Sequence, residues 1–201
     1  MRNLSYLAAP LVALAAPAFA QANDLAAVQA SLRATTTLTA GFVQTDRTGK
    51  ALRGTLALKR PGRVKFDYGQ SAPFTVVADG RSLWFVDYQV KQVSRWPIGK
   101  SPLAALLDPN ADLTRFLRVA PSGDARLVTV EARDPGRPEF GAITLAFSRE
   151  SGAPGGLKLQ GWVALDAQRN RTTVQLFGQR YNAPVADNVF AWRDPRPAAR
   201  K

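Results

Sequence analysis

The side chains that most often carry out enzymatic chemistry are missing from this chain of 201 residues. It contains neither histidine nor cysteine, which removes the commonest general bases, nucleophiles and transition-metal ligands together. Carboxylates remain, but Asp67, Asp79, Asp87 and Asp108 fall at predicted turns or on outer strand faces and form no recognisable catalytic pair. We therefore expect no enzymatic activity, no metal site and no bound cofactor.

Arg60 is the charged residue with the most unusual predicted position. Alternation along its strand places Arg60 on the same side as Leu56 and Leu58. A buried guanidinium requires hydrogen-bond acceptors because arginine does not escape burial by losing its proton. Either Arg60 points inward to polar acceptors, or the strand ends at Lys59 and the Arg60 side chain reaches water beside Pro61.

Short alternating runs around Arg60 predict a sheet. These runs cover residues 38–47, 51–59, 63–68, 74–78, 82–87, 90–96, 126–133, 141–147, 157–165 and 172–179. The connections between consecutive runs are mostly too short for parallel crossovers, which favours an antiparallel meander. About ten strands form a sheet that curls under its own twist. Its inside is either a filled core or a cavity that helices close.

Two segments have the spacing of helices. Residues 23–36 place Leu25, Val28 and Leu32 on one face, with Asn23 or Asp24 as the N-cap. Residues 101–107 begin with Ser-Pro and carry an apolar face, and residues 112–119 are expected to continue as a turn or short helix. The predicted fold class is therefore mainly β with helices.

The first twenty residues have the pattern of an export signal. A positive start, an apolar run and the small-x-small step at residues 18–20 predict cleavage before Gln21. The remaining 181 residues fit one domain, residues 21–201, with a loose basic tail from about residue 194. Removing Arg2 changes the formal net charge from +12 to +11. An exported chain of this charge meets anionic membranes or acidic partners, although a generally basic surface is the plainer alternative. The aromatic residues lack the basic stacking pattern of a nucleic-acid platform, so no nucleic acid is expected.

Two stretches carry a resemblance to a known family. LKRPGRVKFDY at residues 58–68 is followed by VVADGRSLWFVDYQVKQV at residues 76–93. In order and spacing these motifs resemble the outer-membrane lipoprotein carrier protein family (LolA), a family of periplasmic chaperones. The likeness extends to residues 42–44, to residues 101–107 and to residues 188–192 with Pro195.

The resemblance implies an unclosed antiparallel β-barrel with a helical lid over an apolar cavity. It implies a periplasmic monomer that accepts lipoproteins released from the inner membrane, shields their acyl chains and delivers them to the outer membrane. The implied donor is the inner-membrane LolCDE transporter, and the implied acceptor is the LolB receptor or the outer membrane itself. Arg60 matches the family's interior arginine, which implies a role as the lid latch. A lipid- or glycolipid-binding envelope protein, or a sensor of the same fold, is the alternative.

The alternation and the resemblance together suggest which residues form the binding site. The expected acyl-chain cavity is lined by Leu56, Leu58, Val64, Phe66, Phe74, Val76, Leu83 and Phe85. The expected apolar residues of the lid are Leu103, Leu106 and Leu107. An ordinary filled core is the alternative reading of the same side chains.

Overall fold

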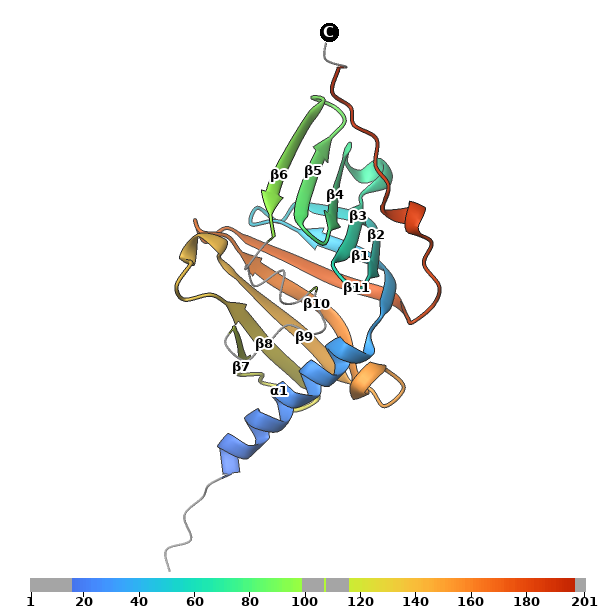
Figure 1. The fold of residues 1–201 in the computed structure, drawn as a ribbon. Helices are drawn as coiled ribbons and strands as arrows, with labels where there is room; N and C mark the ends of the chain where they lie inside the picture. Colours follow the sequence, from blue (N-terminus) through green and yellow to red (C-terminus); the bar gives the residue numbers. More distant parts are fainter. Residues whose placement is uncertain (1–15, 99–106, 108–115, 198–201) are drawn as a thin grey trace, which may run out of the picture.

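A single antiparallel sheet of eleven strands forms most of the computed structural model, which describes residues 16–98, 107 and 116–197 (Figure 1). The first six strands are β1 (Thr37–Thr45), β2 (Ala51–Lys59), β3 (Arg63–Asp67), β4 (Phe74–Asp79), β5 (Ser82–Asp87) and β6 (Gln92–Pro97). The other five are β7 (Leu117–Ala120), β8 (Leu127–Arg133), β9 (Ala142–Arg149), β10 (Leu157–Leu165) and β11 (Arg171–Tyr181). Short 3-10 turns lie between several strands, at Gly69–Ser71, Pro138–Phe140 and Pro154–Gly156, and a further one follows β11 at Asp187–Phe190.

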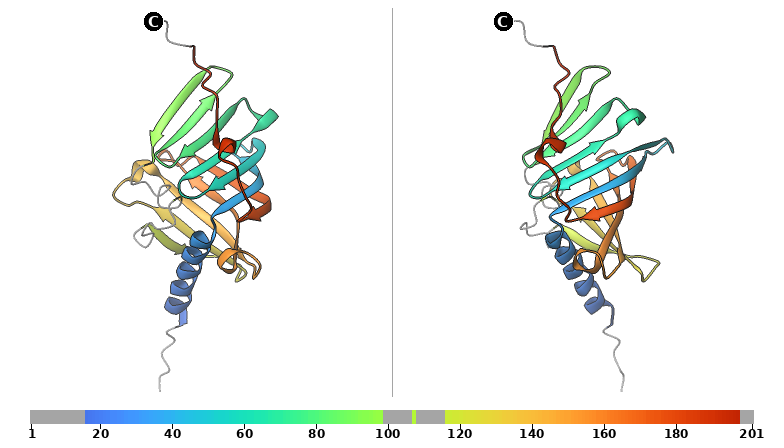
Figure 2. Two further views of the ribbon diagram at one scale, coloured as in Figure 1. Left: turned by 45° about the vertical axis from the view of Figure 1, so that its right-hand side comes forward. Right: turned by 90° about the vertical axis from the view of Figure 1, so that its right-hand side faces the viewer.

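The order of the strands divides the sheet into two meanders. The order is β6-β5-β4-β3-β2-β1-β11-β10-β9-β8-β7. The first strand therefore pairs with the last one at the centre, and β6 and β7 form the two edges. Because these described edges do not pair with each other, the sheet curls without closing, as Figure 2 shows.

The helix α1 (Ala16–Ala34) covers part of the second meander (Figure 1). Its apolar residues Val28 and Leu32 pack among side chains of β7 to β10. The Ser31 hydroxyl donates a hydrogen bond to the Leu157 carbonyl oxygen (3.1 Å), which ties the helix to the start of β10. The 3-10 turn before β10 approaches the helix so closely that a Cβ on Gly155 would lie 2.5 Å from the Ser31 nitrogen. No helix in residues 16–98, 107 and 116–197 is long and apolar enough to cross a bilayer.

The predicted strands are all present, with ends that shift by up to two residues. Two expectations about helices are wrong. The helix begins at Ala16 and not at Asn23 or Asp24, because the alanine-rich stretch before Asn23 has high helix propensity. Of the predicted turn or short helix at residues 112–119, residues 112–115 lie outside the described residues and Phe116 is a turn. Residues 117–119 belong to β7 and not to a helix, because pairing of Leu117 with Ala132 of β8 satisfies the backbone there.

Candidate functional site: the apolar concave face

The cavity residues expected from the sequence lie on one face of the first meander. Residues that are directly opposite in neighbouring strands share a face. The register places seven of the eight expected residues in two rows across β2 to β5, Leu58–Val64–Ala78–Leu83 and Leu56–Phe66–Val76–Phe85. The sheet curls so that this face lies inside, and we call it the concave face.

The expected residues form one apolar cluster with two degrees of burial. Leu56 and Val64 are buried, whereas the other six are half-buried. Phe85 joins through Phe74, whose ring centroid lies 5.0 Å from that of Phe85. A face with many half-buried apolar side chains has surface left for further apolar contact.

The concave face also includes residues that the sequence analysis did not assign to it. They lie on β1, β11 and the turn after β3: Leu38, Ala40, Phe42, Tyr68, Val174 and Leu176. The alternation of apolar side chains along β1 and β11 is a sequence pattern that could have identified these residues as interior. What the local pattern could not supply was the pairing of β1 with β11, which brings the two sets together.

The concave face continues under α1 without a break. The cluster that contains Val28 and Leu32 of the helix shares two half-buried residues, Leu159 and Trp162 of β10, with the cluster of the first meander. The ring of Trp162 packs edge-on against Phe66, with centroids 5.7 Å apart. The apolar interior therefore extends across both halves of the sheet.

One buried residue of the apolar interior, Tyr68, carries a hydroxyl group. The Tyr68 hydroxyl donates a hydrogen bond to the Gln44 side-chain oxygen (2.7 Å), and the Tyr68 ring packs edge-on against Phe42. Burial raises the pKa of Tyr68 to about 12, although the hydrogen bond to Gln44 opposes the change. The hydrogen bond satisfies the hydroxyl group, so the tyrosine is accommodated in the apolar cluster.

Arg60 lies at the end of β2, where the chain turns toward β3. Its Nε and Nη1 atoms are shielded from solvent, and its backbone N–H donates to the Thr36 carbonyl oxygen (2.9 Å). Two residues further on, the Gly62 N–H donates to the carbonyl oxygen of Leu107 (3.2 Å). Arg60 and Leu107 therefore border the same turn.

One of the three expected lid residues can be placed. Leu107 is helical, only 6% exposed, and belongs to the cluster that contains Leu56 and Val64. Leu103 and Leu106 lie outside the described residues. Leu107 comes from the segment between β6 and β7, so that segment reaches the concave face at this point.

The chain after β11 lies on the other face of the first meander. We call residues 183–197 the C-terminal strap. Val185 and Phe190 pack with Ala57, and the ring centroid of Trp192 lies 5.4 Å from that of Trp84. The Lys59 ammonium group contacts the Asp187 carboxylate at 2.5 Å. The strap thus covers the outer face of the first meander around Ala57, Lys59 and Trp84, whereas the concave face presents half-buried apolar side chains.

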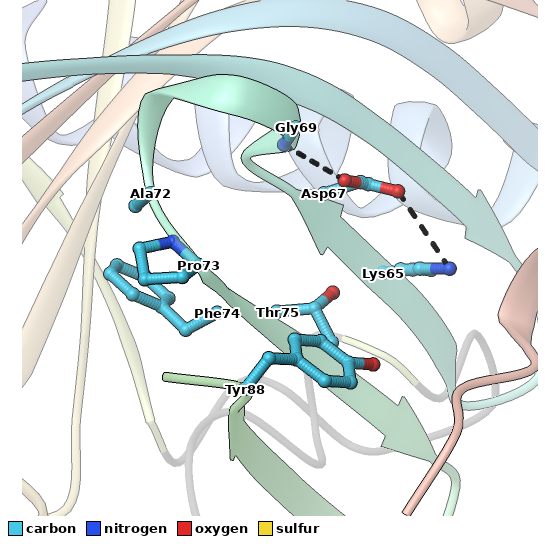
Figure 3. A pocket seen from close by; sticks show the side chains of 8 residues that line it. All are labelled: Lys65, Asp67, Gly69, Ala72, Pro73, Phe74, Thr75 and Tyr88. Carbon is cyan, nitrogen blue, oxygen red and sulfur yellow. Dashed lines mark hydrogen bonds and ion pairs between the residues drawn. The ribbon is translucent and has the colours of Figure 1, made fainter. Parts of the chain in front are cut away.

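A small pocket of about 130 Å³ also lies outside the concave face (Figure 3). Its lining includes Lys65, Asp67 and Thr75, which point to the outer side of β3 and β4. Lys65 and Asp67 form an ion pair at 3.8 Å, and the Tyr88 ring lies beside Thr75. The mixed polar lining and small volume make it a poor site for a long apolar ligand. The described residues contain no group of carboxylates that could hold a metal ion.

An open antiparallel sheet with a helix at one end and an apolar concave face defines a half-barrel protein with an apolar interior. The model of the family described as "Outer membrane lipoprotein carrier protein LolA" matches residues 33–193. The chain belongs to this family.

Two relatives support the assignment over nearly the whole length. The outer-membrane lipoprotein carrier protein of Chromobacterium violaceum is 31% identical over 199 residues, covering 94% of this chain and 91% of its own. That of Methylobacillus flagellatus is 28% identical over 212 residues, covering 98% of both chains. Among solved structures, a DUF1329 family protein from Desulfovibrio piger has a TM-score of 0.51 at 11% identity, covering 85% of this chain and 96% of its own. That structural likeness concerns the fold alone.

Proposed function

We propose that this protein is a periplasmic carrier that takes up lipoproteins released from the inner membrane, holds their acyl chains on its concave face and delivers them to the outer membrane. The observation that carries the proposal is the apolar interior that runs from β2 to β5, past Trp162, to α1. The chain's membership of a family of lipoprotein carriers supports it. These carriers are not enzymes, in keeping with the absence of histidine and cysteine.

The energetics explain why such cargo needs a container. Each acyl methylene removed from water contributes about 0.8 kcal/mol. An acyl chain of about fifteen carbons therefore resists transfer through water by about 10 kcal/mol. Half-buried side chains such as Phe66, Val76 and Leu83 supply apolar contact at the concave face, and their partial exposure leaves them accessible to cargo.

Release of the cargo requires a state that competes with binding. We propose that the segment carrying Leu107 is a lid and that Arg60 is its latch. The Gly62–Leu107 hydrogen bond and the shielding of the Arg60 nitrogens support a closed arrangement at this turn. A closed empty state that gains free energy from the latch favours unloading without any nucleotide.

The proposed partners follow from the route of the cargo. The donor is the inner-membrane LolCDE transporter, and the acceptor is the LolB receptor or the outer membrane. The chain acts as a monomer with acylated lipoproteins as cargo.

The direct test is a release experiment. Purified mature protein is incubated with transporter-containing vesicles, and triacylated lipoprotein is sought in the soluble fraction as a one-to-one complex. We expect Val76→Trp, which fills the concave face, to reduce release severalfold, whereas Thr55→Trp on the exposed outer face leaves it unchanged. Absence of any soluble complex with an active transporter, or recovery of a bound lipid of another class, contradicts the proposal.

A further inference from the structure

The outer face of β1, β2, β10 and β11 differs from the rest of the surface in its charge. In the right-hand view of Figure 2, β1 and β11 run side by side through the middle of the sheet. This face and the two adjoining turns carry six exposed cations, Arg47, Lys50, Arg53, Arg169, Arg171 and Arg180. We call this surface the basic face. The register supports a common surface, because Arg53 lies opposite Val43, which in turn lies opposite Gln175 of β11.

Among the described residues, no ion pair neutralises a cation of the basic face. Seven ion pairs join described residues, and all of them lie elsewhere, for example between Lys59 and Asp187 or between Arg149 and Asp24. A cation on this face is therefore available to an external anion, which is not the case for most cations on the outer side of β2 and β3.

The two nearest carboxylates are engaged within their own turns. Asp46 accepts hydrogen bonds from the Thr48 N–H and hydroxyl and from the Lys50 N–H, at 2.7 to 3.0 Å. Asp166 accepts from the Gln168 and Asn170 backbones and from the Asn170 side chain. The pKa of Asp166 is lowered mainly by the Asn170 side chain and, less strongly, by the charge of Arg47, which shows that the two turns adjoin.

Apolar side chains lie exposed among these cations. Phe177 is 51% exposed, and Leu165 is 38% exposed opposite Arg171. The Phe177 ring lies against Gly41, where a Cβ would lie only 2.3 Å from the ring. About half of Phe177 nevertheless remains exposed to solvent. A side chain that contacts only water at position 177 has no need to be aromatic.

We propose that the basic face docks on the surface of an anionic lipid bilayer. Its cations come from two strands, β2 and β11, and from two turns, so they are spread over a surface and not gathered in one pocket. A continuous layer of headgroup phosphates matches that spread. Exposed Phe177 and Leu165 between the cations suit the boundary between headgroups and acyl chains better than the acidic side chains of a protein. The inference concerns the outer side of the sheet and does not depend on what the concave face binds.

The test is co-sedimentation of the mature protein with phosphatidylcholine vesicles that do or do not contain phosphatidylglycerol. The variant Arg53→Gln/Arg171→Gln/Arg180→Gln removes three charges from the basic face. Its matched control, Arg33→Gln/Arg81→Gln/Lys91→Gln, removes three exposed charges from α1 and from the turns after β4 and β5. Since each cation near an anionic surface contributes about fivefold, we expect the first variant to bind anionic vesicles about a hundredfold more weakly. The control retains binding within about fivefold, and Phe177→Thr weakens binding without changing its salt dependence.

Three results would overturn the proposal. Equal losses for the two triple variants would mean that net charge alone attracts the protein. Undiminished binding by the basic-face variant would show that this face does not dock on the bilayer. Binding to polyglutamate but not to anionic vesicles would assign the face to an acidic protein. A circular dichroism spectrum for each variant checks that it is folded.

Discussion

The backbone N–H of Gly62 donates a hydrogen bond to the carbonyl oxygen of Leu107, with an N···O distance of 3.2 Å. This contact joins the turn after β2 to a residue from the segment between β6 and β7, which is remote in sequence. Gly62 has a φ of +76°, and a Cβ there would lie 2.4 Å from the Cα of Gly80. Glycine is therefore required both by the backbone conformation and by the approach of the turn after β4.

Replacing Gly62 with alanine should destabilise the protein strongly. The left-handed φ alone costs about 1 kcal/mol for alanine, and the backbone clash with Gly80 raises the expected loss to about 2 kcal/mol or more. Gly49→Ala is the matched control, since Gly49 has a φ of +86° but no atom within 4 Å of the position that a Cβ would take. Urea unfolding of both variants measures the difference. Equal losses would show that the contact with Gly80 relaxes easily.

Arg60→Leu should fold and load cargo but deliver it poorly, because the closed empty state loses its polar latch. The measurement is transfer of a labelled lipoprotein from the preformed complex to acceptor membranes. Arg81→Leu, which changes an exposed arginine in the turn after β4, serves as the control. Normal delivery by Arg60→Leu would exclude the latch role.

Attachment of the C-terminal strap should weaken in acid. The hydrogen bond and charge of Lys59, followed by the charge of Arg63, lower the pKa of Asp187 below its ordinary value of 3.8. A lowered pKa in the folded state means that the stabilisation is complete above the unfolded pKa and is lost as the pH falls through the folded value. The protection factors for hydrogen exchange of the amides in residues 183–197 should therefore fall below about pH 4.

Asp187→Asn tests the assignment of that acid response. The variant should exchange faster already at neutral pH and show a smaller further change in acid. Asp194→Asn is the control, because Asp194 pairs with Arg196 inside the strap and not with the sheet. An acid response that persists unchanged in Asp187→Asn would place its origin in another group.

Tyr68 should ionise at about pH 12, because its hydroxyl is buried beside Phe42. Its pKa is raised above the ordinary value of 10.0, so its contribution to stability is complete below pH 10 and is lost as the pH rises through about 12. Ultraviolet titration of the folded protein should show a step that Tyr68→Phe removes. A step for Tyr68 near pH 10 would mean that water reaches the interior.

The sequence alone predicts the strands well where the side chains alternate clearly. The bounds of β2, β5 and β10 coincide with the predicted ones, since one face of each strand contributes to the apolar interior. The four-residue β7 was missed, because Phe116 and Leu117, the first residue of β7, continue an apolar spacing that also fits a helix. Its strand conformation depends on pairing with β8, which no local pattern reveals.

The candidate site is likewise predictable where it depends on local sequence patterns and not where it depends on the pairing of distant strands. Alternation within β2 to β5 was enough to group Leu56, Phe66 and Val76, because short turns join these strands. The contribution of Phe42 and Leu176 depends on the pairing of β1 with β11, which lie at opposite ends of the chain. The position of Trp162 between the two parts of the interior depends on the shift in register between Leu159 and Gly161, which no local pattern reveals.

The strand order also bears on how the molecule folds. Among the described strands, every pairing except β1 with β11 joins neighbours in the sequence. Each meander can therefore assemble from nearby contacts, and the loop-closure entropy of the whole chain is concentrated in one central pairing. A chain that emerges N-terminus first can complete β1 to β6 while β1 still has an unpaired edge. Until β11 arrives, that edge is exposed to pairing with other chains, so the last strand to be made protects the first.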